Sequence, residues 1–494
     1  MMKRTIILVL LSYCGRGIAQ DSTSTYKKRV LESTEVDFLT SYYTQDGDNA
    51  AVTGGIGTEK LTDFTPTIVI AMPLNTDDVL TVDAGISAYT SASSSNLNPF
   101  DGSSSGASSG GGGDDDHDHD GVVTGRQIQA SSVTGSPWVA SSGASRSDVW
   151  GNVSLDYSHS SDDRNGIWNA HAGFSAEFDY TSFGFGGGYA RLFNEKNTEI
   201  SLKGQVYLDT WSPRYPTELD SYIEVNGDLN QGFFQDVPIL NRNGTVINKN
   251  WPANQIWSPV EGFSLIQDKS RNSYSISLGF SQILSKNAQI SLFMDVVQQE
   301  GWLSNPMQRV YFKDRENYYI GNSSSIPFYT SPDNTDVFQL ADDIERLPNT
   351  RTKTPFGMRF NYFINEMLTV RTYYRYYFDN WGMTSHTANI EIPIKLNDRF
   401  TVYPTYRYYT QTAIDYFAPY EEHVSTETYY TSDFDLSAFH ANQYGFGINY
   451  TDIFTKFHIA SLGLKSIDVR FNHYERTTGL KATIISGGLK FVLD

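Results

Sequence analysis

The chain has 494 residues, with 56 aspartates and glutamates against 37 lysines and arginines, which gives a formal net charge of −19. This acidic balance argues against a nucleic-acid partner, because phosphate backbones bind basic surfaces. Aromatic residues make up 14% of the chain, and the mean hydropathy is −0.39. Both values fit a membrane barrel, whose lumen, loops and turns are polar and whose rims carry aromatic rings.

The N-terminus has the pattern of an export signal. Two basic residues precede an apolar core over 6–11, and Gly17 and Ala19 supply the small side chains that cleavage before Gln20 requires. We therefore expect a signal peptide over 1–19 and an exported mature chain.

The segment that follows, 20–34, is expected to lie in the periplasm as an N-terminal extension. The single cysteine, Cys14, belongs to the leader, so the mature chain can form no disulfide. No later stretch holds about 18 consecutive apolar residues, and the sequence therefore predicts no transmembrane helix. An exported, aromatic-rich chain of this kind is expected among the lipids of a Gram-negative outer membrane.

Alternation of apolar and polar residues over 198–211 is the clearest structural signal. One face of this stretch carries Ile200, Leu202, Val206 and Leu208, and the other carries Ser201, Lys203, Gln205 and Asp209. A period of two residues is typical of a β-strand between two different environments. A barrel strand meets lipid on one side and water on the other.

Similar stretches recur in chain order, beginning at about 35–44, 64–74 and 79–92. They form a series of about sixteen strands, each about ten to fourteen residues long, which suffices to cross a bilayer at a tilt. The short turns between them are rich in Asn, Asp, Gly and Ser. They lie at 75–78, 162–166, 194–197, 285–288, 365–366 and 397–399.

Four long connections separate other pairs of strands, at about 93–148, 212–271, 303–352 and 415–438. Counting strands places all four on one rim, as in bacterial barrels with an even strand number, long extracellular loops and short periplasmic turns. The sequence therefore predicts an all-β fold, a transmembrane antiparallel up-and-down β-barrel over 35–494. It leaves open whether a loop as long as 212–271 folds inward and plugs the lumen.

The closing strand is expected within 479–494. Leu489, Phe491 and Leu493 share one face there, and an aromatic C-terminal strand of this kind is similar to the signal for barrel insertion.

A run of metal-ligand side chains interrupts the Gly/Ser-rich loop over 93–148. The run comprises Asp114, Asp115, Asp116, His117, Asp118, His119 and Asp120. Imidazole nitrogens suit Zn²⁺ or Cu²⁺, and carboxylates suit Ca²⁺. The alternative is an acidic loop that solvates the cell surface and holds no ion. No cofactor other than such a divalent metal is predicted.

A second oxygen-rich stretch, over 45–59, does not match a calcium loop. Ala50 stands at an alternating ligand position, and Gly57 replaces the bidentate glutamate of an EF-hand. We interpret it as a glycine-rich connection between the first two strands.

Charged residues of the later strands are expected to point into the lumen. They are Arg359, Arg371, Arg375, Glu391, Arg407, Asp468 and Arg470, accompanied by Tyr373, Tyr377, Tyr403 and Tyr409. A ladder from Arg371 and Arg375 through Glu391 to Arg407 would form a constriction that selects anions, as charged rings do in pores. The alternative is a polar network that only braces the wall.

Catalysis has little support in the sequence. His171, Glu177 and Asp179 are placed on one inward face, but no nucleophile-elbow serine and no HExxH pattern accompanies them. We therefore expect a protein that is not an enzyme.

Several N-terminal segments carry a family resemblance. These are Glu35-Val36-Asp37-Phe38, the run from Tyr43 to Leu61, the segment from Pro66 to Leu74, and Tyr89 to Ser94. They resemble the family catalogued as domain of unknown function 3570, and the resemblance extends over nearly the whole mature chain. It implies an exported outer-membrane protein without assigned activity, encoded beside a small lipoprotein, a thioredoxin-like protein and a flavin transferase. It brings no catalytic residues.

Two functions remain as hypotheses. The first is a non-enzymatic barrel that passes a solute or holds a surface or periplasmic partner, such as a small lipoprotein. The second is a metal-capturing or envelope-redox-associated surface module that uses the Asp/His-rich loop. A soluble, secreted β-rich adhesin is a third reading, which would require the alternation to face two sheets.

Overall fold

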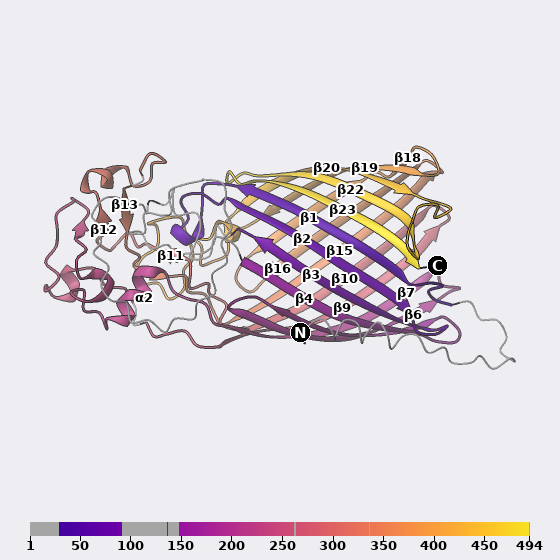
Figure 1. Ribbon diagram of the computed structural model, residues 1–494, viewed down its shortest axis with the longest axis horizontal. Helices are drawn as coiled ribbons and strands as arrows, with labels where there is room; N and C mark the ends of the chain where they lie inside the picture. The colour runs from indigo at the N-terminus through magenta and orange to yellow at the C-terminus, as the bar shows by residue number, and fades with distance from the viewer. Residues whose placement is uncertain (1–28, 91–135, 137–147, 261–262, 335, 494) are drawn as a thin grey trace.

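The computed structural model describes residues 29–90, 136, 148–260, 263–334 and 336–493. They form one closed antiparallel barrel with a folded cap beyond one rim (Figure 1). Closure is made by the first and last strands, which pair from Glu35↔Val492 to Asp46↔Lys481. The predicted fold class is confirmed.

Sixteen strands make the wall. They are β1 (Glu35–Asp46), β2 (Leu61–Pro73), β3 (Asp78–Tyr89), β4 (Asp148–Ser160), β5 (Gly166–Ala176), β6 (Tyr180–Phe193), β7 (Thr198–Trp211), β9 (Lys269–Ser285), β10 (Ala288–Gly301), β15 (Thr350–Asn365), β16 (Leu368–Asp379), β17 (Thr384–Glu391) continued by β18 (Ile394–Lys395), β19 (Phe400–Gln411), β20 (Phe439–Thr451), β22 (Leu462–Arg476) and β23 (Lys481–Leu493). The interruption between β17 and β18 falls at Pro393, which has no N–H for the ladder.

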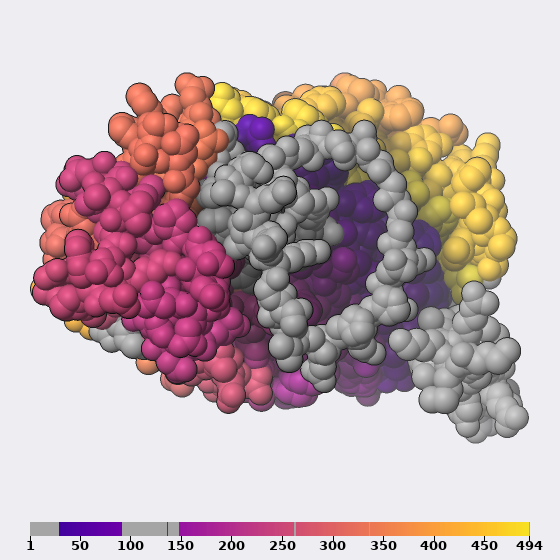
Figure 2. Space-filling view, turned by 60° about the vertical axis from the view of Figure 1, so that its left-hand side comes forward, coloured from indigo at the N-terminus to yellow at the C-terminus, as the bar shows by residue number. Residues whose placement is uncertain are grey.

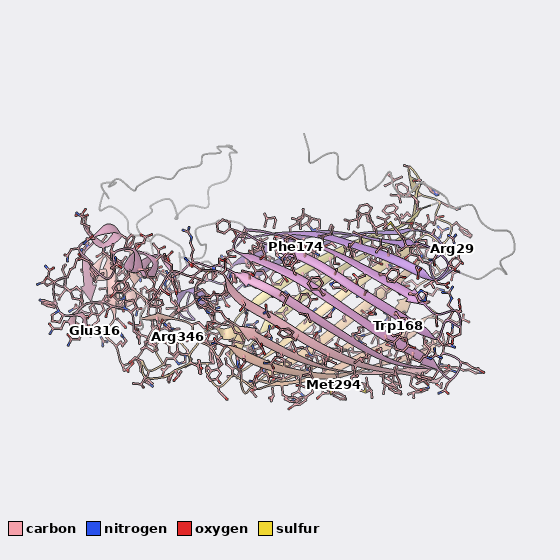
Figure 3. All side chains as sticks on the ribbon, turned by 90° about the horizontal axis from the view of Figure 1, so that it is seen from below. Arg29, Trp168, Phe174, Met294, Glu316 and Arg346 are labelled. Atoms are coloured by element: carbon pink, nitrogen blue, oxygen red, sulfur yellow. The ribbon has the colours of Figure 1, made fainter. Side chains whose placement is uncertain are left out.

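The outer surface of the wall is apolar. On β7, Ile200 and Leu202 are 51% and 52% exposed, whereas Asp209 on the opposite face is 9% exposed. Trp168, Phe174 and Met294 also lie on the outside of the barrel (Figure 3). Exposed apolar side chains on this scale are stable only against lipid. The alternation over 198–211 therefore arises as predicted, because one face of the strand meets lipid and the other meets the lumen.

The two rims differ as predicted. Short turns join the strands at one rim, and asparagine side chains fix several of them. Asn75 Oδ1 accepts the backbone N–H of Asp77 at 2.7 Å, and Asn365 Oδ1 accepts that of Leu368 at 2.9 Å. The long connections all leave the other rim.

Three long connections fold together into the cap, at the left of Figure 1. Its elements include α2 (Thr217–Glu224), β8 (Ile239–Asn241), β11 (Arg309–Val310), β12 (Tyr318–Gly321), β13 (Val337–Gln339), β14 (Asp343–Ile344) and the 3₁₀ turns η2 (Gly232–Phe234), η3 (Ala253–Gln255), η4 (Ser323–Phe328) and η5 (Phe434–Leu436). A core of apolar side chains holds them, with Phe234 and Ile320 fully buried. The indole of Trp257 donates to the carbonyl oxygen of Ala341 at 2.9 Å. In its described part, the 212–271 connection belongs to this cap beyond the rim.

The connection between β1 and β2 is a compact turn around η1 (Ala51–Thr53). Gly54, Gly55 and Gly57 have φ values of +82°, +89° and +90°. Only glycine adopts this backbone conformation readily, which explains the glycine-rich sequence. The interpretation of 45–59 as a glycine-rich connection agrees with the structure.

Candidate functional site in the barrel lumen

Arginines and tyrosines gather on the lumenal face of β15, β16, β17 and β19. The strand register places Arg359 opposite Tyr373 and Arg375 opposite Thr387. On the next strand pair it places Asn389 opposite Arg407. Because partners in a ladder share a face, the three guanidinium groups project to the same side of the sheet.

A cavity of about 760 Å³ lies against this face. Its lining is Arg359, Tyr373, Arg375, Thr387, Asn389, Arg407, Tyr409, Gln411, Asp435, Phe439, Gln443, Tyr474 and Arg476. The structure thus brings together three of the predicted lumenal arginines, Arg359, Arg375 and Arg407, and two of the predicted tyrosines, Tyr373 and Tyr409. It adds Arg476, which the sequence analysis did not name.

The cavity arginines have few partners of opposite charge. Arg359 lies over the rings of Phe293 and Tyr373, at 5.6 and 5.8 Å from their centroids. The Nε of Arg375 is buried and has no hydrogen-bond partner in the described part of the chain. Arg359 and Arg407 are exposed to the lumen. Guanidinium groups stay charged at all accessible pH values, so the cavity is positive.

Arg371 and Glu391 lie in a separate network nearer the short-turn rim. Glu391 receives Arg371 Nη1 at 2.8 Å and Arg470 Nη1 at 3.0 Å. Arg470 also contacts Asp468 at 2.9 Å. A ladder across strands therefore exists, but its second arginine is Arg470 and not the expected Arg407.

Register and a glycine explain this difference. Glu391 stands opposite Thr405, so Arg407 is displaced by two residues toward the cap. On β20, Gly447 lies between Tyr403 and Arg470 in the ladders. A Cβ at this glycine would be 3.0 Å from Arg470 Cγ, which indicates that the arginine crosses the strand there. Its guanidinium then lies 5.0 Å from the Tyr403 ring.

The cap-side limit of the cavity is the connection between β19 and β20. Asp435 in this connection accepts Arg476 Nη1 at 2.6 Å. Gln411 holds the same connection, because its amide donates to the carbonyl oxygens of Asp435 and Ser437 at 2.9 and 2.6 Å. The loop therefore bends over the cavity.

A buried arginine joins three connections, those after β1, β7 and β10, across the barrel opening at the long-loop rim, here called the mouth. Arg309 donates to Glu218 through Nε and Nη2 at 2.7 and 2.9 Å, and to the carbonyl oxygen of Val52 through Nη1 at 2.7 Å. Val52 follows β1, whereas Arg309 follows β10, and these strands stand opposite each other in the ring. The cap residues therefore reach over the mouth from facing sides. Figure 2 shows the cap gathered at that end of the barrel.

The profile of a family described as a protein of unknown function, DUF3570, matches residues 9–491. The chain belongs to this family. The resemblance of its N-terminal segments is therefore confirmed. A search of curated proteins finds no match to this DUF3570 protein.

Several solved barrels are similar to this DUF3570 protein in architecture. A bacterial polysaccharide outer membrane secretin shares 9% identity at a TM-score of 0.40, covering 94% of this chain and 99% of that chain. The Pseudomonas putida toluene transporter TodX shares 9% at 0.34, covering 94% and 90%. The outer membrane protein OpdK of Pseudomonas aeruginosa shares 7% at 0.34, covering 94% and 99%. The likeness is limited to the barrel fold.

The predicted metal run, Asp114–Asp120, lies outside the described residues of this DUF3570 protein. Within the described residues, no group of three or more His, Cys, Asp or Glu side chains is arranged to hold a metal. In the same part of the chain, no helix is long and apolar enough to cross a bilayer.

The residues considered for catalysis do not share a strand face. Glu177 and Asp179 lie in the turn after β5, where the Asp179 carboxylate accepts the indole N–H of Trp211 at 3.2 Å. His171 points into the lumen from β5 and lies 2.9 Å from Asp156. The expectation of one inward face is therefore wrong for Glu177 and Asp179, because the strand ends at Ala176.

Proposed function

We propose that this protein is a non-enzymatic channel of the Gram-negative outer membrane that passes small solutes carrying an anionic group. The observation that carries the proposal is the lumenal cavity lined by Arg359, Arg375 and Arg407, none of which has a carboxylate within ion-pair distance in the described part of the chain. Arg476, paired with Asp435, forms its cap-side edge. Carboxylates and phosphates fit guanidinium groups in a planar, bidentate manner.

The barrel dimensions support passage. Barrels of about sixteen strands enclose an aqueous channel, because their circumference exceeds what wall side chains can fill. Charged rings along such a channel select permeant ions by sign. The paired Arg371, Glu391, Arg470 and Asp468 carry balanced charge and brace the wall. The selecting residues of the proposal are therefore the three unpaired arginines.

The cap supports control of entry from outside. Connections from facing sides of the barrel meet above the lumen, and Arg309 fastens them. Solutes would reach the arginine cavity only around or through this cap. Metal capture by Asp114–Asp120 and binding of a lipoprotein stay predictions.

Neutralising the cavity arginines tests the proposal. In a planar bilayer under a KCl gradient, the triple variant Arg359→Gln, Arg375→Gln, Arg407→Gln should shift the reversal potential toward K⁺, because each side chain loses a positive charge that concentrates Cl⁻. A change of several-fold in the Cl⁻ to K⁺ permeability ratio is expected.

A matched control uses an arginine of the outer face. Arg191 on β6 stands opposite Ile200, outside the lumen, and should leave the reversal potential unchanged when replaced by Gln. The proposal would be refuted if the reversal potential of the triple variant equalled that of the wild type. It would also be refuted if the protein showed no conductance even in the variant Arg309→Met, which should detach the cap.

A further inference from the structure

The lumen carries a second charged wall, opposite the arginines. On β2, β3 and β4, the residues Asp63, Asp83 and Asp156 lie on the face away from the exposed apolar side chains Ile86, Val153 and Leu155. They therefore face the lumen. In the closed sheet, β3 is eight strands from β16 in either direction, and β4 is equally far from β17. The acidic wall stands diametrically across from the basic one.

These carboxylates are not neutralised by arginine or lysine. Asp83 accepts the amide of Asn152 at 3.2 Å, and Asp63 accepts the hydroxyl of Thr65 at 2.9 Å. Asp156 contacts His171 at 2.9 Å, and half of its side chain is exposed. Within the described residues, none of the three carboxylates has an Arg or Lys within ion-pair distance.

The two walls occupy comparable depths in the channel. Asp83 lies at the middle of β3, between Asp78 and Tyr89, and Arg375 lies near the middle of β16, between Leu368 and Asp379. The strands between the walls carry charges of both signs, for example Glu199 and Lys203 on β7. Charge of opposite sign is therefore separated across the lumen.

Glycines keep the space between the walls free. On β6, a Cβ at Gly184 would be 2.7 Å from Cε1 of Tyr207, and one at Gly186 would be 2.9 Å from Cγ of Gln205. The long side chains of β7 thus lie flat over the glycines of β6, against the wall. Solvent can fill the distance between the acidic and the basic wall.

We infer that the channel takes amphoteric solutes, with an oxyanion at one end and an ammonium group at the other. The inference rests on the proposed passage of anions and adds the second end of the solute. Opposed walls of opposite charge produce a field perpendicular to the channel axis, and low-dielectric walls focus it. A zwitterion aligns with this field and contacts both walls, whereas a simple anion contacts one wall and is repelled by the other.

Two sulfonates of equal charge at the acid end provide the probe pair. Taurine carries an ammonium group and ethanesulfonate does not, and neither crosses lipid unaided. In proteoliposome swelling, the double variant Asp83→Asn, Asp156→Asn should lower the ratio of taurine to ethanesulfonate flux about threefold, the effect of one exposed ion pair. The triple arginine variant should lower the flux of both solutes.

The outcomes separate the inference from the function on which it rests. If ethanesulfonate passes and its flux depends on the arginines, but the aspartate variant leaves the flux ratio unchanged, the inference alone fails. If neither solute passes, in the wild type or in Arg309→Met, the proposed passage fails as well. The single variant Asp83→Asn repeats the test without disturbing the Asp156–His171 contact, and heat-modifiable gel mobility checks that each barrel is folded.

Discussion

Replacement of Arg309 by methionine should detach the cap from the barrel mouth. Arg309 and Glu218 are 2% and 0% exposed, so the variant leaves an uncompensated carboxylate in the cap interior. Removing one partner of such a pair costs about 3–5 kcal/mol. The hydrogen bond to the carbonyl oxygen of Val52, which ties the cap to the facing connection, is lost as well. We expect the opening equilibrium to rise at least about a hundredfold.

Two measurements report this opening. Hydrogen exchange of the cap amides, such as those of β12 and β13, should accelerate, while exchange in the barrel strands stays slow. Single-channel conductance should increase, because the connections above the mouth no longer meet. Heat-modifiable mobility of the barrel should not change, since its ladders do not involve Arg309.

A second substitution distinguishes charge burial from general damage. Arg309→Met combined with Glu218→Leu removes both charges and should recover much of the lost protection, because a buried ion pair can be replaced by apolar side chains at little cost. Arg242→Met serves as the matched control, since Arg242 is exposed on the cap. Unchanged exchange in Arg309→Met would show that the pair does not hold the cap.

The barrel was predictable because each wall residue meets one of two environments. The expected alternation over 198–211 coincides with β7, and turns such as 75–78 were marked by asparagine. Boundaries at the loop rim were less predictable: the third strand ends at Tyr89 and not at 92. The sequence continues after Tyr89 with small and polar residues, so the two-residue alternation alone does not mark where the pairing of the strands ends.

The structure of the cap could not be predicted from the sequence. Its contacts join residues far apart in the chain, such as Glu218 and Arg309, and its short elements have no sustained period. The lumen could be predicted in part, less well than the barrel wall and better than the cap. The facing of Arg359, Arg375 and Arg407 follows from period two, whereas the partner of Glu391 depends on register and on Gly447.

Two features of the lumen follow from the alternation of residues along single strands. Arg476 is in phase with Arg470 along β22, so the same alternation places it in the lumen. The aspartates of β3 and β4 alternate with apolar residues in the same way. That these aspartates lie across the lumen from the arginines could be established only from the closed barrel and the number of strands between them.

The stability of the cap should fall as pH rises from about 5 to 9. Glu345 lies 3% exposed between two connections of the cap. Burial raises the pKa of its carboxyl from 4.5 to about 8, and the charge of Asp433 acts in the same direction. The backbone N–H of Asn305 donates to it at 2.7 Å and offsets only part of the shift. Burial also raises the pKa of Asp342 to about 7.

The sign follows from proton binding. Between pH 4.5 and 8 the folded cap holds a proton on Glu345 that the unfolded cap has released. The free energy of cap unfolding therefore decreases through this window and levels off above it. For a pKa shift of this size, the free energy of cap unfolding decreases by at most about 3–5 kcal/mol. Hydrogen exchange of the cap, corrected for intrinsic rates at each pH, measures the decrease.

Glu345→Gln should remove the part of this dependence that lies above about pH 7, because the amide is neutral at every pH and occupies nearly the same volume. The cap of this variant should be as protected at pH 9 as at pH 7.5, whereas the loss of protection between pH 5 and 7 remains in part, because burial also raises the pKa of Asp342 to about 7 and those of Asp220 and Asp433 to about 6. Glu316→Gln is the matched control on the exposed cap surface (Figure 3) and should retain the wild-type profile. If the caps of Glu345→Gln and of the wild type loosen in parallel, Glu345 is not the titrating group. If conductance rises with alkaline pH in the wild type but not in Glu345→Gln, the same carboxyl controls access to the arginine cavity.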